Sequence, residues 1–430
     1  MRRITLRSLL MLLVIGAFGL LTACGGNGGS TPAGVPIPPP AGQNVVPISV
    51  NGGPLLTANP PSAYTNGAFV SVNVCVPGTS TCQTIDDVLV DTGSFGLRIL
   101  GSQLTIALTP LTDSNGDQLN DCVQFLDNSF LWGTVDPADV KMAGEVASST
   151  SIQVIANPTA YSIPTTCSTT SNGTGMNEDT QALLGANGIL GVGPEPVDCG
   201  PPCDPVTVAQ QGQPSLPYFS CSTATGCSPV PVSCGSICGD TVANQQVTNP
   251  VFNFSGDNNG VIIELPAVAD AAATVNGNMI FGIGTQSNNA LGTATVFTLE
   301  SGTDNFTTTY KGQAYSNSFI DSGSNGLFFP DATIPVCPGN LSSFYCPTSN
   351  LTGLTATNTG ANNATNTVTF GVDNTQTLLT NDGSDFAFSN LAGPLAGSFD
   401  WGLPFFYGRN VYTAIDGTTV GNISGPFFAY

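Results

Sequence analysis

Two short segments of the sequence combine residue types that can do acid–base chemistry. Asp91 opens the segment DTGSFGL, and Asp321 opens the segment DSGSNGL 230 positions later. Each aspartate follows an apolar run, VLV in the first case and SFI in the second. A carboxylate at the end of an apolar strand needs hydrogen-bond partners, because its desolvation is otherwise costly. The repeat therefore indicates two carboxyl groups held in matching surroundings.

The composition excludes most other catalytic chemistries. The chain has 430 residues with 28 acidic and 7 basic side chains, and it has no histidine. Without histidine it can build no Ser-His-Asp triad, no Cys-His dyad and no histidine-bearing zinc site. The basic residues beyond position 24 are Arg98, Lys141, Lys311 and Arg409. We therefore expect no nucleic-acid surface, no metal and no cofactor, and chemistry drawn from carboxylates, hydroxyls or thiols.

The elements that must position the two carboxylates are predicted to be strands. The segment 69–76, FVSVNVCV, repeats valine at period two, which is typical of a half-buried strand. Other short runs rich in β-branched residues lie at 151–155, 260–265 and 366–370. With 51 glycines and 32 prolines to supply turns, the chain is predicted to be all-β, with one short helix at 205–212.

The motif repeat predicts two homologous lobes, because its spacing is too long for a solenoid. Each half also carries a later apolar element with glycine, GILGVG at 188–193 and FDWGLPFF at 399–406. We expect an N-terminal β lobe at 46–252, which includes a cysteine-rich insertion, and a C-terminal β lobe at 253–430.

The N-terminus reads as a lipoprotein signal peptide over residues 1–23. Three arginines precede an apolar run that leads into LTAC, and this tetrapeptide resembles a bacterial lipobox ending at Cys24. Residues 24–45 form a Gly/Pro-rich tether. We expect an exported protein that is anchored through lipid on Cys24 and faces the periplasm or exterior. Gly25, the residue after Cys24, favours the outer membrane as the site of the anchor. The alternative is an uncleaved membrane anchor.

The cysteines predict disulfides. Setting Cys24 apart leaves 12 of the 13 cysteines, an even number in an oxidising compartment. Short spacings suggest the pairs Cys75–Cys82, Cys199–Cys203, Cys221–Cys227, Cys234–Cys238 and Cys337–Cys346, which leaves Cys122 for Cys167. A four-cysteine zinc site built from the two C-x-x-x-C pairs is the alternative.

The two motifs and their surroundings resemble pepsin-type aspartic proteases, most closely an uncharacterised group of bacterial pepsin-like lipoproteins. The matching residues are Asp91-Thr92-Gly93-Ser94, Asp321-Ser322-Gly323-Ser324 and Ile189-Leu190-Gly191. Segments 249–254, 277–284 and 408–417 extend the resemblance, which covers the chain from about Asn44 to Tyr430. It implies a bilobal acid-protease fold with a cleft, and hydrolysis of a peptide or protein substrate by the two aspartates and a water. Two close carboxylates share one proton, since they cannot both ionise cheaply.

The resemblance also assigns roles to the neighbours of the aspartates. It implies that the hydroxyls of Thr92 and Ser322 link the two loops. It implies that the N–H groups of Gly93 and Gly323 point at the carboxylates, and that Ser94 and Ser324 bond their outer oxygens. Gly191 and Gly402 would let the apolar strands pass directly behind the loops.

The sequence departs from the family pattern at two places. The family's flap carries Tyr-Gly, whereas the segment 122–135 offers Phe125, followed by Leu126, or Trp132. These two aromatic residues either cover the substrate or pack the first lobe. In the second lobe Asp400-Trp401-Gly402 stands where two aliphatic residues precede the glycine.

We expect a monomeric, lipid-anchored aspartic endopeptidase that uses Asp91 and Asp321. The alternative is a weak or silent relative that binds peptides or a partner protein in its cleft, since a fold does not guarantee activity. Arg98, just past the first motif, either forms an ion pair or faces the cleft.

Overall fold

The computed structural model describes residues 44–56, 63–170, 173–211, 216–300, 302–381 and 383–430. The predicted signal peptide, Cys24 and most of the tether lie outside these ranges. Within them, no helix is both long and apolar enough to cross a bilayer.

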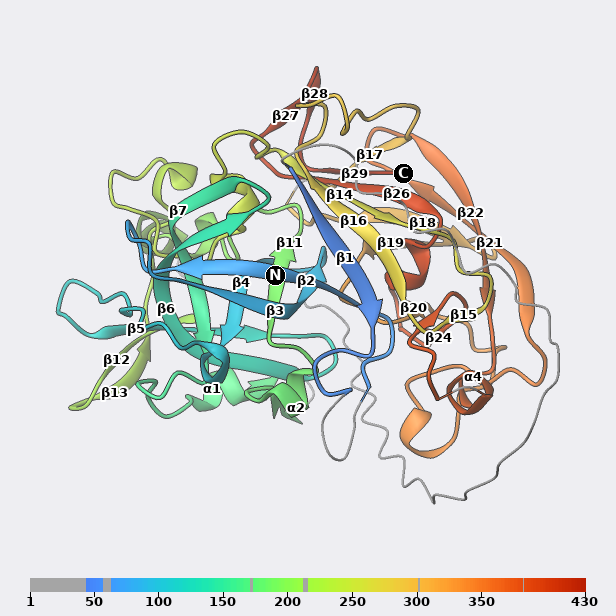
Figure 1. Cartoon of the computed structure of the whole chain (residues 1–430), viewed down its shortest axis with the longest axis horizontal. Helices are drawn as coiled ribbons and strands as arrows, with labels where there is room; N and C mark the ends of the chain where they lie inside the picture. The colour runs from blue at the N-terminus through green and yellow to red at the C-terminus, as the bar shows by residue number, and fades with distance from the viewer. Residues whose placement is uncertain (1–43, 57–62, 171–172, 212–215, 301, 382) are drawn as a thin grey trace.

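The described residues form an all-β protein of two lobes, as the sequence predicts. Figure 1 shows the lobes side by side, the first coloured blue to green and the second yellow to red. The strands up to the end of the first lobe are β1 (Val45–Asn51), β2 (Gly67–Cys75), β3 (Cys82–Asp91), β4 (Phe95–Leu100), β5 (Gln118–Gln124), β6 (Ser129–Met142), β7 (Glu145–Ile155), β8 (Thr169–Thr170), β9 (Gly173–Thr174), β10 (Met176–Asn177), β11 (Gly188–Val192), β12 (Tyr218–Ser222) and β13 (Gly226–Pro229). The strands of the second half are β14 (Gly260–Leu265), β15 (Ala271–Ala272), β16 (Val275–Phe281), β17 (Val296–Thr298), β18 (Phe306–Tyr310), β19 (Gln313–Ile320), β20 (Leu327–Phe328), β21 (Leu351–Thr359), β22 (Thr365–Val372), β23 (Ala387–Phe388), β24 (Ala392–Gly393), β25 (Asp400–Trp401), β26 (Arg409–Ala414), β27 (Thr419–Val420), β28 (Ile423–Ser424) and β29 (Phe427–Ala429).

The described residues contain four α-helices, which are short and lie between strands. They are α1 (Thr165–Ser168), α2 (Gln181–Leu184), α3 (Pro205–Gln211) and α4 (Thr375–Asn381). The helix predicted at 205–212 is therefore confirmed as α3.

The first lobe is a barrel-like sheet. Its strands follow the order β13-β12-β5-β6-β7-β4-β11-β3-β2, and an additional pairing of β2 with β6 curls the sheet back on itself. Strand β2 shows why the sequence folds this way, because Val70, Val72 and Val74 are all buried while Ser71 is exposed. The alternation read from the sequence thus becomes a core face and a solvent face.

A shared sheet joins the two halves of the chain. Strand β1 pairs with β2 on one side and with β16 on the other, so the sheet continues through β16, β14, β26, β29 and β17. The boundary at 252/253 stays a prediction.

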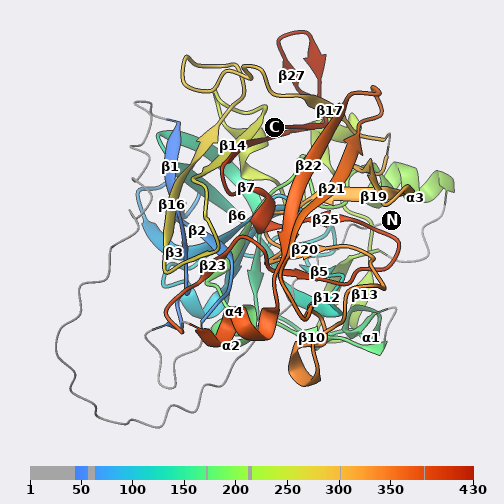
Figure 2. The same ribbon diagram turned by 90° about the vertical axis from the view of Figure 1, so that its right-hand side faces the viewer.

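The second lobe contains a separate seven-stranded sheet. Its order is β22-β21-β18-β19-β25-β20-β24, and the long β21–β22 hairpin crosses the view in Figure 2. Its core is aromatic. Trp401, the side chain just before Gly402, is fully buried and stacks on Phe399 with ring centroids 4.4 Å apart.

Six disulfides are present among the described residues. Five join the pairs predicted from short spacing, and Cys122–Cys167 is the pair predicted by elimination. The six are Cys75–Cys82, Cys122–Cys167, Cys199–Cys203, Cys221–Cys227, Cys234–Cys238 and Cys337–Cys346. The zinc alternative is wrong for this structure, because the four cysteines it needs are oxidised and offer no thiolate. Asp204 lies beside Cys234 and Cys238, but their sulfurs are bonded to each other.

Candidate active site

Asp91 and Asp321 occupy the same position in their lobes, at the carboxyl end of a buried strand. Asp91 is the last residue of β3, and β11 runs parallel to β3 with Gly191 opposite Asp91. Asp321 directly follows β19, and β25 runs parallel to β19 with Trp401 opposite Ile320. In both lobes the strand after the motif also pairs, antiparallel, with this second apolar strand. Each aspartate therefore sits in a turn held between two strands of one sheet.

Glycine is required where the second strand passes behind each turn. A Cβ on Gly191 would lie 2.7 Å from the backbone of Phe95, and one on Gly402 would collide with the carbonyl oxygen of Gly326. Any residue with a Cβ at position 191 or 402 would have to displace this neighbouring backbone. Gly191 and Gly402 therefore lie in close contact with the backbone of the segment that follows each motif.

The two turns are joined by four hydrogen bonds through Thr92 and Ser322. The Thr92 hydroxyl donates to the carbonyl of Ile320 at 3.1 Å and accepts from the N–H of Ser322 at 2.9 Å. The Ser322 hydroxyl donates to the carbonyl of Val90 at 2.8 Å and accepts from the N–H of Thr92 at 3.1 Å. All of these groups are buried, so the lobes are tied together immediately beneath the carboxylates.

Each carboxylate accepts the same pair of hydrogen bonds from its own turn. Asp91 accepts from the N–H of Gly93 at 2.9 Å and from the hydroxyl of Ser94 at 2.5 Å. Asp321 accepts from the N–H of Gly323 at 2.7 Å, and Ser324 Oγ lies 2.8 Å from its second oxygen. These contacts fix the orientation of both carboxyl groups.

The two carboxyl groups lie against each other. A Cβ on Gly323 would be 2.6 Å from Asp91 Cγ and 3.1 Å from Asp321 Oδ1, so the same glycine borders both. Both aspartates have no exposed surface. Burial, followed by the charges of Asp91 and Asp400, raises the pKa of Asp321 well above its usual range. A pair in this environment retains a proton when other aspartates have lost theirs.

Comparison with known proteins places the chain in a family. A family model described as "Protein of unknown function (DUF3443)" matches residues 40–430. The chain belongs to this family. Among solved structures, the aspartic proteinase from Irpex lacteus aligns with 90% of this chain and 96% of its own, at 16% identity and a TM-score of 0.48. No curated protein sequence matches the chain.

The two flap candidates of this DUF3443 protein are buried in the first lobe. Phe125 is 3% exposed and packs in an apolar cluster with Leu89 and Ile189. Trp132 is also 3% exposed, packs edge-on against Phe219, and donates from Nε1 to the carbonyl of Tyr161 at 3.0 Å. These positions favour the packing interpretation of both residues.

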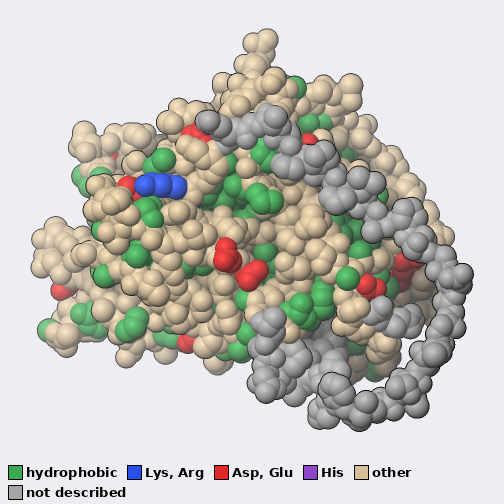
Figure 3. Space-filling model, viewed as in Figure 1, with side chains coloured by type: hydrophobic (Ala, Val, Ile, Leu, Met, Phe, Trp, Pro, Cys, Tyr) green, Lys and Arg blue, Asp and Glu red, His purple; other side chains and the backbone are tan. Residues whose placement is uncertain are grey.

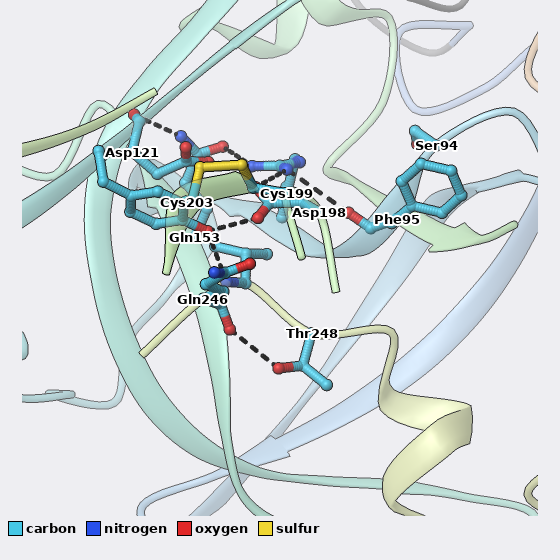
Figure 4. A network of polar contacts seen from close by, with 12 residues as sticks. Ser94, Phe95, Asp121, Gln153, Asp198, Cys199, Cys203, Gln246 and Thr248 are labelled. Atoms are coloured by element: carbon cyan, nitrogen blue, oxygen red, sulfur yellow. Dashed lines mark hydrogen bonds and ion pairs between the residues drawn. A yellow bond between two sulfur atoms is a disulfide. The ribbon is translucent and has the colours of Figure 1, made fainter. Parts of the chain in front are cut away.

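Arg98 of the DUF3443 chain forms a buried ion-pair network, as the first of its two interpretations expects. Its guanidinium lies 2.5 Å from a carboxylate oxygen of Asp121 and 2.9 Å from one of Asp198, and it also donates to Gln153. Figure 4 shows Asp121, Gln153 and Asp198 drawn together in this network. Burial alone would lower the pKa of Arg98, but the two carboxylates outweigh it and raise that pKa. The network links β4, the strand that follows the first motif, to β5 through Asp121 and to β7 through Gln153.

One polar contact at the site does not follow from the resemblance. Asp400, on β25 behind the second motif, places Oδ2 at 2.7 Å from Ser324 Oγ. The sequence shows that Asp400-Trp401-Gly402 departs from the family pattern of two aliphatic residues before the glycine. The contact of Asp400 with the second motif depends on the pairing of β25 with β19 and β20, which brings together residues 76 positions apart.

Charged residues make up 8% of the sequence, and few of them appear on the face drawn in Figure 3. On the face seen in Figure 3, acidic side chains are scattered and basic atoms are confined to a small area. On this face there is no extended basic patch among the described residues.

Proposed function

We propose that this protein is an aspartic endopeptidase in which Asp91 and Asp321 activate a water that attacks the peptide carbonyl. The observation that carries the proposal is the matched pair of turns. Each carboxylate accepts an N–H and faces a hydroxyl of its own turn, and the turns are linked through Thr92 and Ser322.

The chemistry follows from one proton shared by two carboxyl groups. The ionised carboxylate accepts a proton from the water while its oxygen forms the new bond to the carbonyl carbon. The protonated carboxyl donates a hydrogen bond to the carbonyl oxygen, where negative charge develops. Collapse of the tetrahedral intermediate breaks the C–N bond, and the leaving nitrogen takes up a proton from the pair. Oxidation state is unchanged throughout, and neither a metal nor a covalent enzyme intermediate is required.

The second candidate function is a silent or weak relative that binds peptides or a partner protein. The observation that favours it is the burial of Asp91 and Asp321, neither of which has exposed surface. Of the eight residues in the two Asp-[Thr/Ser]-Gly-Ser motifs, Gly93 is the one that is partly exposed. A catalytic protein must bring substrate into contact with these two carboxyl groups, whereas a protein that binds at another part of the cleft need not.

Proteolysis of an unfolded protein substrate from about pH 3 to about pH 7 tests the proposal. The chain without its signal peptide and Cys24 is compared with Asp91→Asn and Asp321→Asn, with and without pepstatin. Cleavage that is lost in both variants and blocked by pepstatin supports the endopeptidase. A folded protein that cleaves nothing at any pH, or variants that cleave as well as the wild type, would refute it.

We also propose that the protein is exported and held at a membrane by lipid on Cys24. The six disulfides support export to an oxidising compartment. The full-length chain should fractionate with membranes, and Cys24→Ala should release it. A Cys24→Ala chain that remains in the membrane fraction would exclude the lipid anchor.

A further inference from the structure

A third buried carboxyl group stands directly behind the Asp91–Asp321 pair. Asp400 has no exposed surface, and its Oδ1 has no hydrogen-bond partner among the described residues. Its other oxygen, Oδ2, lies 2.7 Å from Ser324 Oγ, and the same Oγ lies 2.8 Å from Asp321 Oδ2. Asp400, Ser324 and Asp321 therefore form one continuous line of oxygen atoms that ends at the pair.

The proton count along this line decides the state of Asp400. A serine hydroxyl carries one proton, so Ser324 can donate fully to one of its two carboxyl neighbours and must accept from the other. Both oxygen–oxygen distances are those of hydrogen bonds, so one of the two carboxyl groups has to bring a proton of its own. Two ionised carboxylates facing one hydroxyl in a dry interior would leave an unpaired negative charge there.

The surroundings of the two carboxyl groups favour the proton on Asp400. Asp321 accepts a further hydrogen bond from the N–H of Gly323, which stabilises its ionised form. Asp400 lies on β25 opposite Phe319 and Phe328 of the flanking strands, and the charged groups that act on it are the carboxylates Asp91 and Asp321. Burial raises the pKa of both Asp321 and Asp400 well above the usual range, so these shifts do not choose between the two groups. The choice rests on the hydrogen bonds, because Asp321 has the additional N–H of Gly323 and Oδ1 of Asp400 has no partner among the described residues.

In the part of the first lobe that the structure describes, the position that corresponds to Asp400 is apolar. Ile189 is opposite Leu89, two residues before Asp91, and Asp400 is opposite Phe319, two residues before Asp321. The two strands are therefore in the same register, and an apolar residue takes the place of Asp400 in the first lobe. The extra carboxyl makes the surroundings of the pair asymmetric.

We propose that Asp400 is a positioning residue that stays protonated, donates to Ser324 Oγ, and thereby directs the Ser324 proton to Asp321. This inference rests on the proposed function, because the effect of Asp400 would be to keep the negative charge of the Asp91–Asp321 pair on one of its two members. Asp400 does not touch the substrate in this scheme. It acts on the pair through Ser324.

Loss of the Asp400 proton should limit activity at high pH. Ionised Asp400 would draw the Ser324 proton away from Asp321 and add a negative charge beside the pair. Three coupled carboxyl groups then lose protons as one unit, so the alkaline limb of the pH profile reports the whole cluster. A variant that cannot ionise at position 400 should keep its activity to higher pH.

The experiment compares Asp400→Asn, Asp400→Ile and the control Asp136→Asn by kcat/KM against pH. The substrate is a peptide spanning the first site that the wild type cleaves in an unfolded protein, and circular dichroism verifies that each variant folds. Asp136 is also a fully buried carboxyl, but its hydrogen-bond partner is Thr134, outside the cluster.

Asp400→Asn keeps a donor for Ser324 and cannot ionise. We expect it to stay within about threefold of wild-type activity at the optimum and to move the alkaline limb upward by about half a pH unit or more. Asp400→Ile, which copies the first lobe, removes the donor and should lower kcat by about five- to tenfold. The limb of Asp136→Asn should coincide with that of the wild type. An unshifted limb in Asp400→Asn, or wild-type kcat in Asp400→Ile, would overturn the proposal while leaving the endopeptidase intact.

An infrared measurement judges the proton without using activity. The carbonyl-stretch band of protonated carboxyl groups is recorded at neutral pH for the wild type and for Asp400→Asn. A component lost in the variant supports a protonated Asp400, and an unchanged band overturns it. If the wild type cleaves nothing, the proposed function fails, and this band still decides the state of Asp400.

Discussion

The link between the two motif turns gives the sharpest test of how this site is held together. Thr92→Val keeps the shape of the side chain but removes its hydroxyl, and with it the bonds to the carbonyl of Ile320 and from the N–H of Ser322. Two buried backbone groups are then left without these partners. At about 1 to 2 kcal/mol for each, the free energy of unfolding should fall by about 2 to 4 kcal/mol.

Thr413→Val is the matched control. Thr413 is also fully buried, but its hydroxyl oxygen has no hydrogen-bond partner among the described residues. Removal of that hydroxyl loses no bond and should change the free energy of unfolding by less than about 0.5 kcal/mol, or increase it.

Urea unfolding with disulfides intact, followed by tryptophan fluorescence, measures both variants. Thr92→Val combined with Ser322→Ala should cost less than the two changes separately, because both hydroxyls belong to one network. The reasoning is refuted if Thr92→Val costs no more than Thr413→Val, or if the double variant is simply additive.

Three further predictions concern stability. Arg98→Met leaves Asp121 and Asp198 without their buried cation, so the free energy of unfolding measured in urea should fall by about 3 to 5 kcal/mol. The control Lys311→Met breaks an ion pair in which the lysine side chain is 53% exposed, and it should lower the free energy of unfolding by less than about 1 kcal/mol. Equal losses in the two variants would contradict the importance of the buried network. Burial raises the pKa of Asp136 to about 6, so the folded state binds its proton more tightly than the unfolded state and stability falls as pH rises from about 4 to about 6. Asp136→Asn should remove about 3 kcal/mol of that decline, and parallel stability curves for variant and wild type would rule this out. Replacement of Cys122 and Cys167 by alanine removes a disulfide that spans 45 positions and should lower the free energy of unfolding by about 4 kcal/mol. The same replacement of Cys199 and Cys203, which are 4 positions apart, should lower it by about 2 kcal/mol. A larger loss for the Cys199–Cys203 pair would count against loop entropy as the cause.

The roles of the residues in the two motifs were predicted through the resemblance, and some of these contacts are local in the chain. The hydrogen bonds from Gly93 and Ser94 to Asp91 span two and three positions, and the same holds for Gly323 and Ser324. The disulfides with short separations are predictable because their cysteines are neighbours in the chain. The cross-links through Thr92 and Ser322 also came from the resemblance, but they join residues about 230 positions apart and depend on how the two lobes meet.

Features that depend on packing between distant segments could not be predicted. Phe125 and Trp132 are candidates for a cover over the site by their position in the chain, but burial in the first lobe is decided by how β5 and β6 curl. The partners of Arg98 could not be named either, since Asp121 and Asp198 approach it from 23 and 100 positions away.

The sequence by itself determined that two Asp-[Thr/Ser]-Gly-Ser motifs exist, that each follows an apolar run, and that the chain has no histidine to use in a site. Only the tertiary structure decided how the turns meet and which other groups reach them. The pairing of β25 with β19 and β20 brings Asp400 to Ser324, while the same register in the first lobe brings Ile189. The physical reason is that turn chemistry is written in adjacent residues, whereas the charge environment of a buried carboxyl is set by whatever the fold packs against it.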